Sequence, residues 1–441
     1  HVRSDKEYNG LRLSSNFVHC IYVHNGNIWV GTDNGGINKF SLRQLKLDNI
    51  VNIPGDATSL SNGCVNATFV EPDGTLWVGT VDGGLNRRGA GEKTFTHFTT
   101  SNSPLTHNSV STLTAADRIL WIGTWGGGVY WLDMDNPDRL NRLEVQPQYA
   151  RIISHIGALA YDKLNNGLWI GSNDGIFFYD SRSRKLLMPF EGCNLVRGCI
   201  GSLIDSNDRL WMGCITGMRV INLRSRKKGK FSCDSYVYKL DNPDSRLIDK
   251  ITSFCETRDS SIYIGSNGNG IYRLTGVHNG RMTFKCYTTQ DGLANNGVKG
   301  IVEGSYGRLW IATNNGLSVM NPKDEAFSNY GEVEGLLCNK FYWNAAVCEG
   351  NRIYLGSEKG LTSINVDEMA TSSAEKVVLT NLNVDNMPIL SGSRFIDGDI
   401  STAKRITLHE SDKSFELFFS TLRYDGDGRS VYCYRMKEFE K

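Results

Sequence analysis

Short apolar runs, many with alternating apolar and polar positions, recur along the whole chain and are separated by glycine, asparagine and aspartate. Alternation with a period of two predicts β-strands, and the intervening residue types predict tight turns. We find no stretch of about ten residues or more with a helical spacing of apolar positions, which argues against helical repeats. The pattern therefore predicts an all-β protein.

One short stretch returns with little change, as IWVGT at 28–32, LWVGT at 76–80 and LWIGT at 120–124. Eight copies can be aligned, and their aromatic residues are Trp29, Trp77, Trp121, Trp169, Trp211, Tyr263, Trp310 and Tyr354. Successive copies lie 42 to 52 residues apart. A period in the forties with several short strands in each repeat is typical of a β-propeller, so we expect seven or eight four-stranded blades.

The second repeat shows the expected plan of a blade. Residues 64–71 and 75–80 read as two strands joined by a Pro-Asp-Gly turn, and two further strands follow Gly83 and Gly84. Trp77 and Gly79 are two residues apart, so both face the same side of the sheet. A glycine at this position lets a neighbouring blade approach closely. We interpret the repeated aromatic residue as packing between blades.

Residues 1–368 carry the repeats and are predicted to form the propeller. The last repeat lacks an obvious fourth strand. Residues 2–11 resemble the end of a preceding repeat and could complete it, which would give eight blades. Alternatively, the first repeat belongs to a preceding propeller and the last seven repeats close alone. Both alternatives are compatible with the sequence.

From residue 369 to residue 441 the aromatic-x-Gly signature is absent. Apolar positions alternate over 376–390, 405–409 and 414–424, and 430–439 is a further strand-like run. About four strands of this kind predict the N-terminal part of an immunoglobulin-like β-sandwich.

Lys and Arg total 48 and Asp and Glu total 47 among the 441 residues. A chain without basic excess is not expected to bind nucleic acid or an anionic membrane. No apolar run is long enough to span a bilayer. The sequence begins at His1 without a signal segment, and we interpret it as a piece of a longer protein whose membrane anchor lies elsewhere.

The sequence offers little catalytic or metal-binding chemistry. The 11 cysteines form no CxxC pair, and we interpret most of them as small buried hydrophobic residues, with a Cys193–Cys199 disulfide left open. The eight histidines lack metal-ligand spacing, and no GxSxG stretch occurs. The acidic loop at 133–138 reads as a solvated turn. No catalytic residue, metal or cofactor is predicted.

A ligand is expected at one end of the channel. In a four-stranded blade, the connection from the preceding blade and the turn after the second strand lie at the same end, so both surround one mouth. Most repeats carry small polar residues there, and departures from this rule are candidate binding residues. Trp125 stands at the turn position of the third repeat. Its ring face could stack on a sugar, or it could cap its own blade.

Basic residues occupy corresponding positions of later repeats. His155, Arg197 and Lys250 lie where blades begin, and Arg219 follows the second-strand turn of the fifth repeat. They predict a basic arc suited to an acidic sugar or sulfate, unless each is an ordinary solvated charge. Tyr342 and Trp343, in the last repeat, either line a ligand cleft or join the propeller to the C-terminal module, and we favour the second interpretation.

The repeat pattern resembles the two-component regulator propeller repeat over roughly residues 16–368. Residues 339–365 resemble the closing repeat of such propellers. Residues 376–441 resemble the opening of a triple-tyrosine domain, whose Tyr-x-Tyr-Arg element is matched by residues 432–435. This order is similar to the periplasmic sensor region of Bacteroides-type hybrid two-component systems.

The resemblance implies a periplasmic, non-enzymatic sensor of glycan-derived oligosaccharides. It also implies a transmembrane helix and a histidine kinase beyond residue 441. The family carries two seven-bladed propellers, so this chain would hold the second one and a remnant of the first. Ligand binding would then change the placement of propeller and sandwich. A protein-interaction scaffold and a propeller polysaccharide lyase or hydrolase are the alternatives, and the sequence leaves the ligand and a homodimer open.

Overall fold

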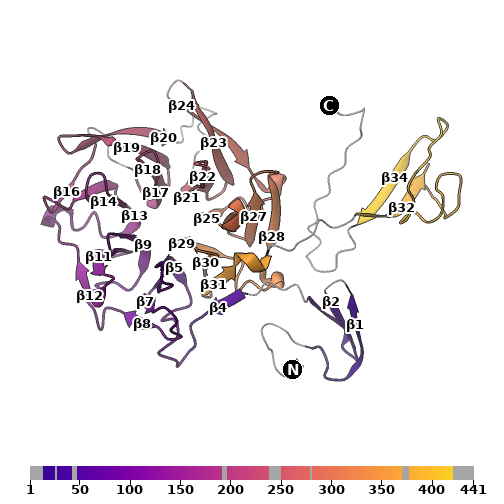
Figure 1. Ribbon diagram of the computed structural model, residues 1–441, viewed down its shortest axis with the longest axis horizontal. Coiled ribbons are helices and arrows are strands. Elements are labelled where there is room, and N and C mark those ends of the chain that lie inside the picture. Colours follow the sequence, from indigo (N-terminus) through magenta and orange to yellow (C-terminus); the bar gives the residue numbers. More distant parts are fainter. Residues whose placement is uncertain are drawn as a thin grey trace. The chain divides into compact units, whose positions relative to one another are not determined.

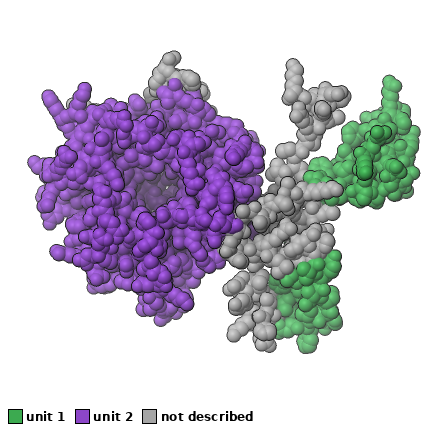
Figure 2. Space-filling view, in the orientation of Figure 1, with its two compact units in different colours: residues 1–44, 369–441 green, residues 45–368 purple. Residues whose placement is uncertain are grey.

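The computed structural model describes residues 13–24, 27–41, 47–190, 196–237, 250–278, 281–369 and 377–420. The chain divides into two compact units (Figure 2). Unit 2 comprises residues 45–368, and unit 1 comprises residues 1–44 and 369–441. Helical structure in the described ranges consists of single 3-10 turns, namely η1 (Pro147–Tyr149), η3 (Thr289–Asp291), η4 (Ser305–Gly307), η5 (Glu332–Glu334) and η6 (Val366–Met369).

Unit 2 is a β-propeller whose described residues form seven four-stranded antiparallel blades (Figure 1). Blade 1 is β5 (Val65–Val70), β6 (Leu76–Thr80), β7 (Gly84–Arg88) and β8 (Thr96–Phe98). Blade 2 is β9 (Val110–Ala116), β10 (Ile119–Thr124), β11 (Gly128–Asp133) and β12 (Asn136–Arg142). Blade 3 is β13 (Ile156–Asp162), β14 (Gly167–Ser172), β15 (Ile176–Asp180) and β16 (Lys185–Leu187).

The remaining blades follow the same order. Blade 4 is β17 (Cys199–Ile204), β18 (Arg209–Cys214), β19 (Gly217–Lys227) and β20 (Lys230–Val237). Blade 5 is β21 (Ile251–Glu256), β22 (Ile262–Ser266), β23 (Ile271–His278) and β24 (Arg281–Tyr287). Blade 6 is β25 (Val298–Glu303), β26 (Leu309–Thr313), β27 (Leu317–Asn321) and β28 (Ala326–Tyr330). The first strand of each blade lies innermost and contacts the first strands of both neighbours (Figure 1).

Blade 7 closes the ring by joining distant parts of the chain. Its strands β29 (Phe341–Glu349), β30 (Arg352–Ser357) and β31 (Leu361–Asn365) come from the last repeat. The fourth strand is β4 (Leu47–Ile50), which pairs antiparallel with β31. The last repeat therefore lacks a fourth strand in sequence because residues 47–50 supply it. The described residues of unit 2 thus form seven blades, and residues 2–11, which the eight-blade alternative uses, lie outside the described residues.

The repeated aromatic residue and glycine pack one blade against the next, as the sequence predicts. Trp77 is fully buried in a cluster that joins residues of blades 1 and 2. A Cβ atom on Gly79 would lie 2.5 Å from Cγ1 of Val110, on the innermost strand of blade 2. The indole N–H of Trp77 donates to the Glu71 carboxylate, at 2.9 Å. Burial of the large ring thus comes with a partner for its polar atom.

The first repeat does not belong to this ring, which corrects the boundary of the predicted propeller. Its strands β1 (Val18–His24), β2 (Asn27–Thr32) and β3 (Gly36–Ser41) form a separate three-stranded sheet in unit 1. Ile37 is 74% exposed, whereas Leu85 at the same position of blade 1 is fully buried. The described residues of the first repeat, 13–24 and 27–41, therefore carry the signature without packing as a blade of unit 2.

The C-terminal residues form a small sheet of β32 (Val378–Val384), β33 (Met387–Pro388) and β34 (Phe415–Ser420), in the order β33-β32-β34. Leu382, Val384 and Ile396 are its buried centre. The strand expected at 405–409 is reduced to an isolated bridge between Ile406 and Ile396. Residues 430–439, with the Tyr-x-Tyr-Arg element, lie outside the described residues. The predicted second sheet of a sandwich is not among the described strands.

Cys199 and Cys214 stand directly opposite each other on β17 and β18. Their Sγ atoms are 3.3 Å apart, and both are buried free thiols. Cys193, which the sequence suggests as a partner for Cys199, lies outside the described residues. The register of the two strands, which the sequence does not display, decides which cysteines meet.

Candidate ligand-binding site at the mouth of the propeller

Two sets of loops surround one mouth of unit 2, as the repeat predicts. In most blades, the first residue of the turn after the second strand donates its backbone N–H to the carbonyl of a residue that leads into the first strand. These bonds include Val81 to Cys64, Trp125 to Ser109, Asn173 to His155, Asn267 to Lys250, Asn314 to Gly297 and Glu358 to Lys340. Figure 2 shows the face of unit 2 hollowed at its centre.

Trp125 and His155 are neighbours at this mouth, although the sequence singles them out separately. They form a β-bridge between blades 2 and 3. Their ring centroids are 5.5 Å apart with an interplanar angle of 89°. Trp125 is 43% exposed, so much of its ring is open to solvent. The edge-to-face contact with His155 fixes the orientation of the indole while leaving surface available to a ligand.

Arg197 and Lys250 are exposed and lie where blades 4 and 5 begin. With His155 they place basic side chains at three successive blades. The rim also carries exposed acidic residues, Asp82, Asp174 and Glu358. The Glu358 carboxylate lies 4.0 Å from the Lys340 amine. The basic arc therefore covers one part of a rim of mixed charge.

Arg219 does not join the arc. It lies on β19 opposite Met212, on the face of blade 4 that packs against blade 3. Its guanidinium is close enough to Cys214 and Cys233 to influence both thiols electrostatically. The sequence places Arg219 near the turn correctly, but strand alternation directs its side chain between blades and away from the mouth.

Tyr342 and Trp343 lie at the start of β29, in blade 7 of unit 2. Tyr342 packs against the apolar cluster shared by blades 7 and 1, and burial raises the pKa of its hydroxyl. Trp343 faces the Lys299 amine, which lies 4.2 Å from its ring centroid. The contacts of both side chains are thus made within unit 2.

A ring of β-bulges at the start of the innermost strands explains these positions. In β5, Val65 pairs with Thr80 and Ala67 with Gly79, which leaves Asn66 as an extra residue. The same irregularity recurs in every blade of the ring. The bulge residues are Asn66, Ser111, Gly157, Ile200, Thr252 and Lys299, with residues 342–345 in blade 7. Bulges redirect side chains, here at the innermost strands.

Two polar residues of this ring were missed from the sequence, namely Lys299 and Asn344. Asn344 adopts a positive φ of 57° and spans the ring, donating to the carbonyl of Gly157 at 2.7 Å and to that of Ser111 at 3.3 Å. Lys299 is 9% exposed and donates to Oδ1 of Asn267 at 3.1 Å. A comparison of bulge positions between repeats would have found Lys299, because the other single-residue bulges are uncharged.

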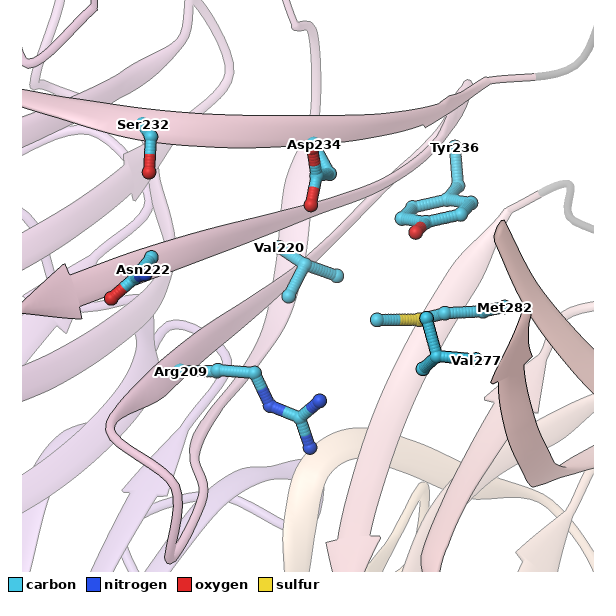
Figure 3. Close-up of a pocket in the computed structure, with 8 residues that line it drawn as sticks. All are labelled: Arg209, Val220, Asn222, Ser232, Asp234, Tyr236, Val277 and Met282. Atoms are coloured by element: carbon cyan, nitrogen blue, oxygen red, sulfur yellow. The ribbon is translucent and has the colours of Figure 1, made fainter. Parts of the chain in front are cut away.

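A separate cavity of about 200 Å³ lies between blades 4 and 5, lined by Arg209, Val220, Asn222, Ser232, Asp234, Tyr236, Val277 and Met282 (Figure 3). The Arg209 guanidinium is already engaged, with its Nε 2.7 Å from the Asp205 carboxylate. Because β18 runs from Arg209 towards the mouth at Cys214, this cavity lies nearer the opposite end. It does not extend the candidate site.

Within the described ranges, no group of three or more His, Cys, Asp or Glu side chains is placed to hold a metal ion. Nor does this part of the chain contain a helix long and apolar enough to cross a membrane. The chemistry of the mouth consists of a stacking surface, hydrogen-bonding groups and charges of both signs.

The family model described as "Two component regulator propeller" matches residues 12–34 and 292–315. Two segments of the chain thus match this repeat. One match covers β1 and β2 in unit 1 and the other covers β25 and β26 of blade 6, so segments that match the repeat occur in both units.

A curated relative, Histidine kinase P4 of Formosa agariphila, is 24% identical over 348 residues. The alignment covers 76% of this chain and 25% of the relative, so the chain spans about a quarter of that protein's length.

Among solved structures, the extracellular domain of a hybrid two-component system of B. thetaiotaomicron superposes with a TM-score of 0.66 at 22% identity, covering 94% of this chain and 54% of that one. A second such domain from the same organism superposes with a TM-score of 0.56 at 19% identity, and the alignment covers 95% of this chain and 56% of that one. Virginiamycin B lyase of Staphylococcus aureus superposes with a TM-score of 0.54 at 13% identity, and the alignment covers 73% of this chain and 99% of the lyase chain. At these identities the likeness shows the fold.

Proposed function

We propose that this chain is the extracytoplasmic ligand-sensing part of a two-component signalling protein and that it binds a glycan-derived oligosaccharide at the mouth of unit 2. The sensing role is supported by the regulator propeller repeats and by the similarity to a histidine kinase and to extracellular domains of hybrid two-component systems. The similarity to extracellular domains also supports a periplasmic location. The proposal is of a binding module and not of an enzyme.

The observation that carries the ligand class is the exposed indole of Trp125. An open aromatic face at a rim of hydrogen-bonding side chains suits a sugar, because the ring buries apolar C–H groups while rim donors and acceptors meet the hydroxyls. His155 holds the indole from one side, so little side-chain freedom is lost on binding. Arg197 and Lys250 add charge nearby for an acidic group.

The test is a thermal-shift screen of the whole chain against neutral and acidic oligosaccharides of plant, host and microbial glycans. A ligand that binds the folded state raises the melting temperature saturably. Trp125→Ala should weaken the affinity by about tenfold, the loss expected when one stacking contact is removed. Tyr306→Ala is the matched control, because Tyr306 is an exposed aromatic residue in η4, beyond the opposite end of β25.

A saturable shift that survives Trp125→Ala unchanged would contradict the proposed site. Consumption of the oligosaccharide during the assay would contradict the binding-module proposal and favour the lyase or hydrolase alternative, which the propeller fold also supports in virginiamycin B lyase. Signal relay would follow from a ligand that binds one placement of the two units more tightly than another.

A further inference from the structure

Lys299 is a buried cation whose charge has no acidic partner. It is 9% exposed at the bulge of β25, and burial lowers the pKa of its amine. Of the described residues, no carboxylate lies within 4.0 Å of this amine. Buried charges in proteins are ordinarily paired, because taking an unpaired charge out of water is costly. The Asn267 amide and the Trp343 ring stabilise the ammonium in part, and neither carries the negative charge that would pair with it.

The other polar bulge residues show what a structural role looks like at this position. Thr252 donates to the carbonyl of Val298 on the next blade at 2.8 Å, and Asn66 donates to that of Val110 at 3.4 Å. Ser111 makes the corresponding bond to Ile156. Each side chain thus ties its blade to the next one. Lys299 departs from this pattern and turns its amine to Asn267 and to the Trp343 ring.

Two donors at this place lack acceptors. An ammonium group has three N–H donors, and Asn267 is the acceptor that the described residues offer to that of Lys299. The indole Nε1–H of Trp343 is buried, with no acceptor among the described residues. A ligand that satisfies both donors must therefore accept hydrogen bonds. A negative charge on that ligand would also offset the cost of burying the amine.

The same place is connected to the basic part of the rim. The backbone N–H of Asn267 donates to the carbonyl of Lys250 at 2.9 Å, and the side chain of Asn267 holds Lys299. One asparagine thus bonds to an exposed lysine of the rim and to the buried lysine below it. An anionic group drawn to the rim by Lys250 would find the unpaired amine at the next position inward.

We propose that the centre of the mouth is an anion site, in which Lys299 and Trp343 receive the carboxylate or sulfate group of an acidic sugar. This inference deepens the proposed function by naming the ligand's chemistry and rests on the same mouth. Carboxylate and sulfate oxygens are the shared chemistry, since both accept from an ammonium and from an indole N–H. The sugar ring attached to the group would lie towards the exposed rim.

Calorimetric titration of the whole chain at neutral pH and constant ionic strength tests this. The probes are glucuronate, glucose 6-sulfate and, as the uncharged match, glucose. The wild type should bind one or both acidic probes more tightly than glucose, and the stronger of the two identifies the group. Lys299→Met keeps the buried stem and removes the charge, so it should weaken that binding by about tenfold or more.

Lys285→Met is the matched control and should bind as the wild type does, because Lys285 lies on β24, the last strand of blade 5, and pairs with Glu325 in the turn between β27 and β28. Equal affinity for glucose and both acidic probes, or full retention of acidic binding in Lys299→Met, overturns the anion site. If Lys299→Met does not fold, Trp343→Phe decides. It keeps a ring and removes the N–H, so weaker acidic binding supports the site and unchanged binding overturns it.

The two proposals fail separately. If a neutral oligosaccharide stabilises the protein and neither acidic probe binds, the anion site is wrong and the sensing proposal stands. If the acidic probes bind through Lys299 and no oligosaccharide in the screen binds, the anion site stands and the oligosaccharide proposal is wrong.

Discussion

Lys299 is recognisable as a candidate functional residue because it differs from the residues at the same position of the other repeats. Equivalent positions carry Asn66, Ser111 and Thr252, whose side chains bond to the next blade. The Lys299 amine instead contacts Asn267 and the Trp343 ring. A repeated structure makes such a residue conspicuous, because three other blades show a bond to the next blade at the same position.

The pH dependence of stability should report this burial. Burial lowers the pKa of Lys299 to about 8, whereas a lysine in an unfolded chain titrates near 10.4. Between these values the unfolded chain holds a proton that the folded protein has released, so this group makes folding more favourable as pH rises. From about pH 7 to about pH 10, the wild type should gain on the order of 2 kcal/mol over Lys299→Met.

Denaturant unfolding of both proteins at the two pH values measures this difference. The other titratable groups are present in both proteins and cancel in the comparison. A difference in unfolding free energy that does not change with pH would contradict the buried, unpaired state of Lys299.

Position 79 requires a glycine because blade 2 approaches it closely, and not because of the backbone conformation of Gly79. A Cβ atom there would lie 2.5 Å from Val110, within the packed interface. Gly79→Ala should therefore destabilise the protein by about 1–3 kcal/mol, the usual cost of overpacking. Gly268→Ala is the control, since nothing lies within 4 Å of its added Cβ. Equal melting temperatures for the two variants would contradict the proposed packing.

At the scale of elements, β4 is the strand that completes the ring. It pairs with β31, whose Leu361 and Ile364 are fully buried. A fragment that begins at residue 45 keeps β4, and one that begins at residue 52 leaves blade 7 with three strands. The shorter fragment should melt roughly 5 °C or more below the longer one.

Differential scanning calorimetry of the two fragments makes this comparison. The longer fragment should retain the melting temperature that unit 2 shows in the whole chain, because strands β1–β3 form a separate sheet and no blade of the ring. Equal melting temperatures for both fragments would contradict closure by β4.

The pair of cysteines on β17 and β18 predicts a specific cross-link. Opposed positions and a 3.3 Å separation of the Sγ atoms suit a disulfide. A two-electron thiol oxidant should join Cys199 to Cys214 with the loss of two hydrogens, slowly, because the hydrogen bond to Cys199 and burial raise the pKa of the Cys214 thiol. Peptide mapping that finds both thiols free after full oxidation would contradict this register.

At the scale of the whole molecule, the repeat predicts most of the fold. Each aromatic-x-Gly pair determines how one sheet packs against its neighbour, so eight copies of the pair predict eight similar sheets. Which seven of them share a ring depends on β4, whose four residues have no distinctive pattern. Closure joins residues about 300 positions apart, and such pairing is a property of the ring and not of any segment.

The candidate site is predicted less completely than the fold. Trp125 and His155 are found because rim positions can be counted from the repeat, and the structure brings them together. Arg219 lies between blades because strand alternation sets its side of β19, which counting of rim positions does not reveal. The positions of Tyr342 and Trp343 depend on the irregular stretch 342–345 of β29, which the repeat does not predict. Bulges alter the alternation on which such counting depends.

The central claim is that the ligand binds at the mouth of unit 2. Hydrogen exchange of the whole chain, with and without the oligosaccharide that gives the largest thermal shift, tests this most directly. We predict slower exchange at residues 124–128, 154–157, 266–270 and 340–345, with the outer strands unchanged. Slower exchange confined to the outer strands, or to β32–β34, would contradict the claim.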